Sequence, residues 1–294
     1  MANDIQHRLH RLAWVCVAIT LLTAAGCTTL RPSIPAPKMH AAANSCIRVI
    51  PALPSMQLPS DAVPFPKSAY VLVPATSAAG LLMPIPFVSD LVSGTINRSD
   101  AKDYQGQLGG LNPMQAAQRA LGQPPFASIC AATDAPQLHS FVFLVEGHDN
   151  QYRLTLVFQL QQGAWIGRYQ EHLPTTIPKE SLRAISPALL NQLRQEMESG
   201  AQLLASLLLE DLQGRLPATG AKVDIGSLYL IGSNVAGLIA PEHLHFRDTE
   251  LISEQGDELL MRRSGSMTAP GQSGALLFGV HHFRKDQLFY FRRQ

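Results

Sequence analysis

The sequence predicts an α+β fold, in which an antiparallel strand meander is followed by one long helix and then by further β-hairpins. Three observations carry this prediction. Residues 152–161 alternate apolar and polar side chains, which is the period of a β-strand. Residues 186–214 hold a leucine-rich stripe at helical spacing between an N-cap signal and a glycine. Residues 223–293 contain short apolar runs separated by polar or glycine-containing turns.

The meander is predicted within residues 137–173. In the alternating run the apolar members are Tyr152, Leu154, Leu156, Phe158 and Leu160, and the others are Arg153, Thr155, Val157, Gln159 and Gln161. This pattern predicts a strand with one dry face. A continuous apolar strand, Phe141–Val145, precedes the polar turn at 148–151, and Trp165–Leu173 follows the turn Gln162-Gly163. We therefore expect three antiparallel strands in chain order.

The long helix is predicted to begin at Ser186, the N-cap, with Pro187 in the first turn, and to end near Gly214. Its apolar stripe consists of Leu189, Leu193, Met197, Gly200, Leu204, Leu208 and Leu212. A glycine in mid-helix costs about 1 kcal/mol relative to alanine, so Gly200 indicates close packing. We expect this helix to cover the meander. A shorter helix is predicted after Asn112-Pro113 by the same N-cap logic.

Five further strands are predicted after the helix: Val223–Ile231, His243–Ser253, Glu258–Arg263, Ala275–Arg284 and Leu288–Arg293. The turns at 255–257 and 284–287 are expected to be hairpin turns. The last strand mixes Phe and Tyr with Arg, and a basic edge strand of this kind discourages strand addition.

Composition excludes some classes of partner. The 294 residues are 46% hydrophobic and 15% charged, with a net charge of +1, so no nucleic acid is predicted as a partner. The chain is long enough for one large domain or two small ones. Scarce charges and 21 prolines suit an exported protein with extended segments.

The N-terminal segment has the features of a secretory signal. Residues 12–25 carry no charge, and this run is shorter than the roughly 20 residues that a membrane-spanning helix needs. The stretch Leu21–Cys27, LLTAAGC, resembles the lipobox of bacterial lipoproteins, although Ala24 stands where leucine is usual. The resemblance implies that residues 1–26 are removed and that Cys27 carries acyl chains. Thr28, in place of an aspartate, then favours the outer membrane and its periplasmic face. An ordinary signal peptide cut near Ala25 and an uncleaved anchor are the alternatives.

Residues 27–68 are predicted to be a proline-rich tether, and residues 69–294 a periplasmic α+β domain with a possible sub-division near residue 215. The tether includes an apolar island at 46–50 that would suit a short edge strand. Cys46 and Cys130 remain after lipidation of Cys27, and an oxidising periplasm makes them a candidate disulfide. Two free thiols are the alternative.

An apolar segment follows the tether, with no charge between Lys67 and Asp90. It predicts a buried strand, a loop and an amphipathic helix, or alternatively a docking surface. The residues proposed for that surface are Leu81, Leu82, Phe87, Val88 and Leu91.

Candidate chemistry is incomplete in the sequence. Ser273 lies in GQSGA, which resembles the G-x-S-G of chymotrypsin-like proteases, but no matching upstream histidine accompanies it. His243 and His245 share one strand face and are weak metal candidates, which need a third ligand from Glu242, His281 or His282. Glu146, His148 and Asp149 are expected to form a solvated turn. We predict no catalytic residue, no metal and no cofactor.

These observations favour a lipid-anchored protein of the outer membrane that acts by binding and is not an enzyme. The expected role is envelope assembly or maintenance, with another envelope protein as partner and the membrane reached through the lipid anchor. One alternative is an immunity lipoprotein that inhibits a toxic hydrolase in the periplasm. Another is a hydrolase that uses Ser273 or a histidine-based metal site.

Overall fold

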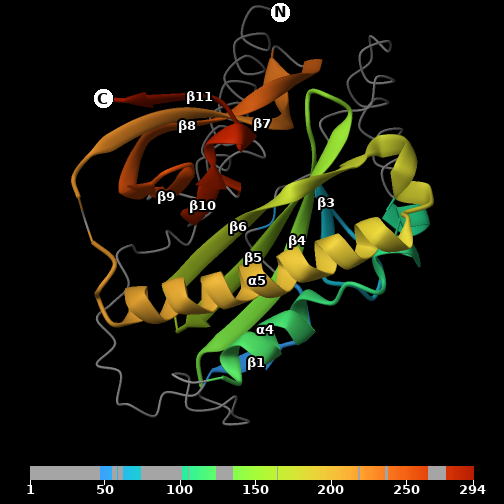
Figure 1. The fold of residues 1–294 in the computed structure, drawn as a ribbon, viewed down its shortest axis with the longest axis horizontal. Coiled ribbons are helices and arrows are strands. Elements are labelled where there is room, and N and C mark those ends of the chain that lie inside the picture. The colour runs from blue at the N-terminus through green and yellow to red at the C-terminus, as the bar shows by residue number, and fades with distance from the viewer. Residues whose placement is uncertain are drawn as a thin grey trace, which may run out of the picture. The chain divides into compact units, whose positions relative to one another are not determined.

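The computed structural model describes residues 47–54, 58, 62–73, 101–104, 106–123, 135–163, 165–217, 219–235, 238–263 and 276–294, without the side chains of 232–241. Within these residues a mixed sheet of many strands is combined with a few helices, which confirms the α+β class (Figure 1).

Eleven strands of the described residues form one sheet, in the order β11-β7-β8-β9-β10-β6-β5-β4-β3-β2, and β1 also pairs with β4. They are β1 (Arg48–Ile50), β2 (Val63–Pro64), β3 (Tyr70–Val73), β4 (Gln137–Glu146), β5 (Gln151–Gln162), β6 (Trp165–Pro178), β7 (Lys222–Val235), β8 (Leu238–Gln255), β9 (Glu258–Arg263), β10 (Gly279–Arg284) and β11 (Leu288–Arg293). Strands from both sides of residue 215 therefore belong to the same sheet.

The meander of β4, β5 and β6 is confirmed, since β5 pairs antiparallel with both neighbours. The prediction of a single dry face is wrong. Tyr152, Leu154 and Phe158 belong to the core on one face. On the opposite face, the side chains of Arg153 and Gln159 are also buried, at 6% and 0% exposure. The C-terminal strands fold across that face and remove it from water.

Helix α5 (Pro187–Leu212) covers one face of the meander, beside the short helix α4 (Pro113–Leu121) (Figure 1). The amide of Leu189 donates a hydrogen bond to the Ser186 side chain at 3.2 Å, which caps the first turn of α5. A Cβ atom added to Gly200 would lie 3.0 Å from Cγ of Glu171 on β6. The close packing predicted at Gly200 is therefore confirmed.

A second core lies on the other face of the meander. It joins apolar side chains of β3–β5 to those of β7–β10, and its larger members include Phe141, Phe143, Tyr229, Phe246, Met261 and Phe283. Figure 1 shows β7–β11 gathered away from α4 and α5. The meander is thus a shared central layer with a core on each side.

The hairpin turn at 255–257 is confirmed, because β8 and β9 pair antiparallel through Gly256, whose φ is +59°. The hairpin predicted at 284–287 is wrong. A 3₁₀ helix, η2 (Lys285–Gln287), carries the chain to β11, which pairs with β7 instead of β10. The physical reason is Gln287, whose side-chain amide donates to the carbonyl oxygens of His172 and Leu173 in β6. These bonds hold the turn against β6 and direct the chain away from β10.

The folded part also begins earlier than the predicted boundary at residue 69. Strand β1 pairs parallel with β4, and β2 pairs antiparallel with β3. Ile47 and Phe65 are buried in the core beneath the helices. Apolar burial therefore draws 47–54 and 62–68 out of the predicted tether, while the short strand expected near residues 46–50 is present as β1.

Candidate functional site

Several residues singled out in the sequence lie outside the described part of the structure. They are Cys27, Cys46, Leu81, Leu82, Phe87, Val88, Leu91, Cys130 and Ser273. The lipid anchor, the disulfide, the apolar docking segment and the serine site therefore stay predictions.

His243 and His245 lie on β8, on the face opposite the core residues Leu244 and Phe246. The third metal ligand expected from β10 does not join them. His281 is fully buried against His172, and His282 pairs with Glu171. In the described residues no group of three or more His, Cys, Asp or Glu side chains is placed to hold a metal ion.

The two β8 histidines belong instead to an aromatic surface, which we call the edge patch: His148, His243, His245, Phe289 and Tyr290. The Phe289 ring stacks on His243 with centroids 5.4 Å apart and an interplanar angle of 9°. His148 lies 5.5 Å from His243, ring to ring. Phe289 is 64% exposed and is the large apolar side chain that the described residues leave most open to solvent.

Two local features place the aromatic rings of β11 on this face. The register of β11 against β7 shifts between Leu288 and Tyr290, so Phe289 is the extra residue of a bulge. Opposite Tyr290, Gly226 has no side chain, and an added Cβ would lie 2.6 Å from the tyrosine ring. Tyr290 therefore lies over the β7 backbone, and its hydroxyl is 3.2 Å from Nδ1 of His245.

The edge patch adjoins an open edge of the sheet. Strand β11 is the first in the strand order and pairs only with β7 among the described strands. The exposed side chains of Arg292 and Arg293 follow the patch, and Arg293 forms an ion pair with Glu254. The Nδ1 atom of His243 is buried and has no hydrogen-bond partner among the described residues. This surface combines exposed aromatic area, positive charge and a strand edge that no other described strand pairs with.

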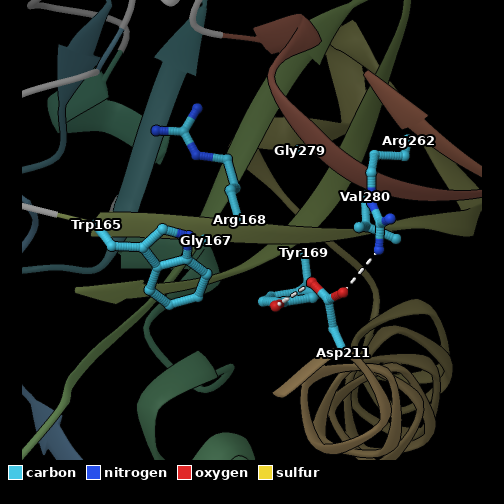
Figure 2. A pocket seen from close by; sticks show the side chains of 8 residues that line it. All are labelled: Trp165, Gly167, Arg168, Tyr169, Asp211, Arg262, Gly279 and Val280. Carbon is cyan, nitrogen blue, oxygen red and sulfur yellow. Dashed lines mark hydrogen bonds and ion pairs between the residues drawn. The ribbon is translucent and has the colours of Figure 1, made fainter. Parts of the chain in front are cut away.

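A second candidate is the hollow in Figure 2, lined by Trp165, Gly167, Arg168, Tyr169, Asp211, Arg262, Gly279 and Val280. Its cavity volume of about 10 Å³ is the space of about one water molecule. Asp211 accepts a hydrogen bond from the Tyr169 hydroxyl at 2.8 Å and pairs with Arg262 at 2.7 Å. Burial and the nearby Asp211 charge raise the pKa of Tyr169. These contacts fix α5 to β6 and β9 and leave no room for a substrate.

The sequence did not reveal a third cluster, which lies inside the second core. Its members are Thr155, Gln170, His172, Tyr229 and His281. Nδ1 of His172 is 2.5 Å from the Tyr229 hydroxyl, and Nε2 of His172 is 3.1 Å from Nδ1 of His281. Burial lowers the pKa of His281 to about 3 and lowers that of His172 strongly as well. The available signal is the polar alternation of β5, in which Thr155 stands on the face that the single-dry-face prediction leaves to solvent.

The acidic residues of the hairpin tip are engaged in ion pairs. Asp149 accepts two hydrogen bonds from the Arg153 guanidinium, both at 2.8 Å, and Lys179 pairs with Glu146 at 2.8 Å. The hydrogen bonds from Arg153 lower the pKa of Asp149 to about 2. The expectation of a merely solvated turn is therefore too simple.

Comparison with protein-family models, with curated proteins and with solved structures finds no match to this chain. Among the residues that the structure describes, no helix combines the length and apolar character needed to cross a membrane.

Proposed function

We propose that this chain is a lipid-anchored binding or scaffold protein of the outer membrane, facing the periplasm, with a role in envelope assembly or maintenance. The lipobox-like LLTAAGC supports the anchor, and Thr28 supports the outer membrane. Several acyl chains on Cys27 would give stable attachment, because a single chain binds a membrane only marginally.

The observation that carries the binding role is the edge patch at the open edge of the sheet. An exposed edge strand offers unpaired N–H and C=O groups to an extended segment of another protein. The exposed ring of Phe289 lies beside that edge and offers apolar area of the kind that anchors protein interfaces.

Charge indicates which kind of strand would be accepted. Addition of a second copy to β11 would bring the arginines of both copies, Arg292 and Arg293, to one edge, which disfavours self-association. The basic edge discourages addition of a neutral or basic strand, but it would meet an extended segment with acidic side chains favourably, most directly at Arg292, since Arg293 already pairs with Glu254. The proposed partner is therefore another envelope protein that presents an acidic, extended segment.

Photocrosslinking in intact cells tests this role. Benzoylphenylalanine replaces Phe289 on the edge patch, and in a matched control it replaces Gln195, which is exposed on α5. We expect one discrete envelope-protein adduct from position 289, absent from position 195 and lost when Arg292→Glu and Arg293→Glu are added. The same adducts from both positions, or an adduct unaffected by the charge reversal, would refute strand addition at β11. A secreted hydrolase as the crosslinked partner would identify the immunity role instead.

The anchor is tested separately, so that the two parts of the proposal can fail independently. A clickable palmitate analogue should label the wild type, and Cys27→Ala should lose the label while the protein is still made. Label retained in Cys27→Ala would refute lipidation at this residue without bearing on the edge patch.

A further inference from the structure

The joint between the meander and the C-terminal strands is short. Strands β6 and β10 pair in parallel through three registered residue pairs, Tyr169 with Val280, Gln170 with His281 and Glu171 with His282. In comparison, β4 and β5 are registered over ten pairs. We call this β6–β10 joint the seam. With so little backbone pairing, side chains must hold much of the seam together.

Hydrogen bonds across the seam assign a proton to each imidazole. Nε2 of His281 is 2.9 Å from the carbonyl oxygen of Leu277, which only accepts, so this nitrogen carries the proton. The other nitrogen of a neutral His281 must then accept, and Nε2 of His172 donates to it. Nδ1 of His172 is left as an acceptor for the hydroxyl of Tyr229, with the hydroxyl of Thr155 3.0 Å away. The chain of bonds is complete only when both rings are neutral.

Gln170 is consistent with this assignment. Its side-chain amide nitrogen carries two hydrogens and donates them to the carbonyl oxygens of Leu276 and Phe278, at N···O distances of 3.2 and 2.9 Å. The amide nitrogen also lies 3.2 Å from Nε2 of His281, where both atoms are donors. This approach therefore adds no hydrogen bond, and it would become more repulsive if His281 were charged.

The surroundings give an imidazolium little compensation. Phe283 stacks on His172 with ring centroids 3.6 Å apart, and Phe246 meets His281 edge-on at 4.9 Å. Burial is the largest effect that lowers both pKa values. His281 and His282 lower the pKa of His172 further; for His281 the hydrogen bond to the Leu277 carbonyl works to raise the pKa and Arg168 to lower it, and burial outweighs the Leu277 bond. The remaining groups that face the pair are the neutral Thr155 and Tyr229.

The neighbouring pair of Glu171 and His282 responds in the opposite direction. Their side chains are 2.6 Å apart, and Glu258 approaches His282 at 3.8 Å. Burial works to lower the pKa of His282, but the hydrogen bond and charge of Glu171 outweigh it and raise the pKa. Burial also raises the pKa of Glu171, against the effect of His282. Because the pKa of His282 is raised, acidification charges His282 beside its carboxylate partner, whereas it can charge the buried pair only by breaking bonds.

We propose that the seam is an acid-operated joint, in which protonation of His172 and His281 releases β10 from β6 while the meander and its helices stay folded. Since both groups have lowered pKa values in the closed seam, the seam is most stable above the ordinary histidine pKa of about 6.5. Below that pH the opening equilibrium rises by up to tenfold per pH unit for each histidine that takes up a proton. Opening would expose the edge of β6 and the part of the second core to which β10 contributes Phe283.

Hydrogen exchange of the full chain in detergent, at pH 7.5, 6.5, 5.5 and 4.5 and corrected for intrinsic rates, tests the proposal. We expect protection of β10 to fall by at least tenfold between pH 6.5 and 4.5 while β4 and β5 keep theirs. Unchanged protection of β10, or loss in all three strands together, would overturn it.

Variants identify the titrating groups. His281→Gln keeps a donor and an acceptor but does not titrate. The opening equilibrium of β10 should therefore rise less steeply on acidification, by up to a factor of ten less per pH unit. His282→Gln is the matched control and should keep the wild-type pH dependence. Tyr229→Phe removes the bond that favours neutral His172 and should shift opening to higher pH. An unchanged slope in His281→Gln refutes the assignment. If His281→Gln does not fold, Tyr229→Phe provides the test: an opening transition at the same pH as in the wild type refutes the assignment.

Discussion

Asp211→Asn tests the contact by which α5 is attached to the sheet near its C-terminal end. The carboxylate of Asp211 pairs with Arg262 on β9, and their side chains are 12% and 8% exposed. Asparagine keeps an acceptor for the Tyr169 hydroxyl, so the substitution removes mainly the charge. Arg262 would remain buried without its counter-ion.

The magnitude follows from two opposing effects. Breaking a buried ion pair on one side costs about 3–5 kcal/mol. Asp211 lies in the last turn of α5, where a negative charge is unfavourable by about 0.3–1 kcal/mol, and the substitution relieves this. We therefore expect the free energy of unfolding to fall by about 3 kcal/mol, or the Tm by roughly 6–12 °C for a domain of this size.

Urea unfolding at pH 7 measures the effect, with fluorescence of Trp165 as the probe, because this residue lines the same hollow. The double variant Asp211→Asn with Arg262→Met is the control, since it removes both charges and fills similar volume. It should be more stable than Asp211→Asn alone by about 2 kcal/mol. A loss below about 1 kcal/mol in the single variant, or a double variant no more stable than the single, would show that the pair behaves as a solvated surface pair.

Three further outcomes are expected. Gly279→Ala should lower the free energy of unfolding by about 3 kcal/mol or more, because φ is +118° and the new Cβ would lie 2.4 Å from a β6 carbonyl oxygen. Gly163→Ala is the control: φ is +58° in open space, so the cost should be about 1 kcal/mol. Equal urea midpoints for the two variants would contradict this. Asp149 should stabilise the fold above about pH 4 and lose this effect as the pH falls towards 2, so Asp149→Asn should flatten that part of the pH–stability curve measured by urea titration. Alkylation of the unfolded exported chain should find two more thiols after reduction if Cys46 and Cys130 pair, and two free thiols without reductant would exclude the bond.

Local signals in the sequence placed several elements correctly. Asn112 and Ser186 cap α4 and α5 through their side chains, as N-cap chemistry predicts. Gly256 forms the predicted β8–β9 turn with a positive φ. Each of these signals depends on residues within a few positions of one another, so the sequence carries it directly.

Long-range pairings could not be obtained in this way. Nothing near Leu288–Arg293 indicates that its partner is β7, and nothing near His281 indicates Gln170 of β6. The same limit hid the polar cluster. The alternation in β5 correctly indicated two faces, but only the fold of β7–β11 decides that Thr155 and Gln159 face a second core and not water.

The seam also has a consequence for the order in which the chain acquires structure. β4, β5 and β6 are consecutive and joined by short loops, so we expect them to form early, whereas His281 must find Gln170 across 111 positions. Until residues 279–284 are available, the second core lacks Phe283 and β6 lacks the strand that pairs with it beyond β5. We therefore expect a chain that ends before Gly279 to aggregate during refolding more readily than the full chain, as light scattering would show.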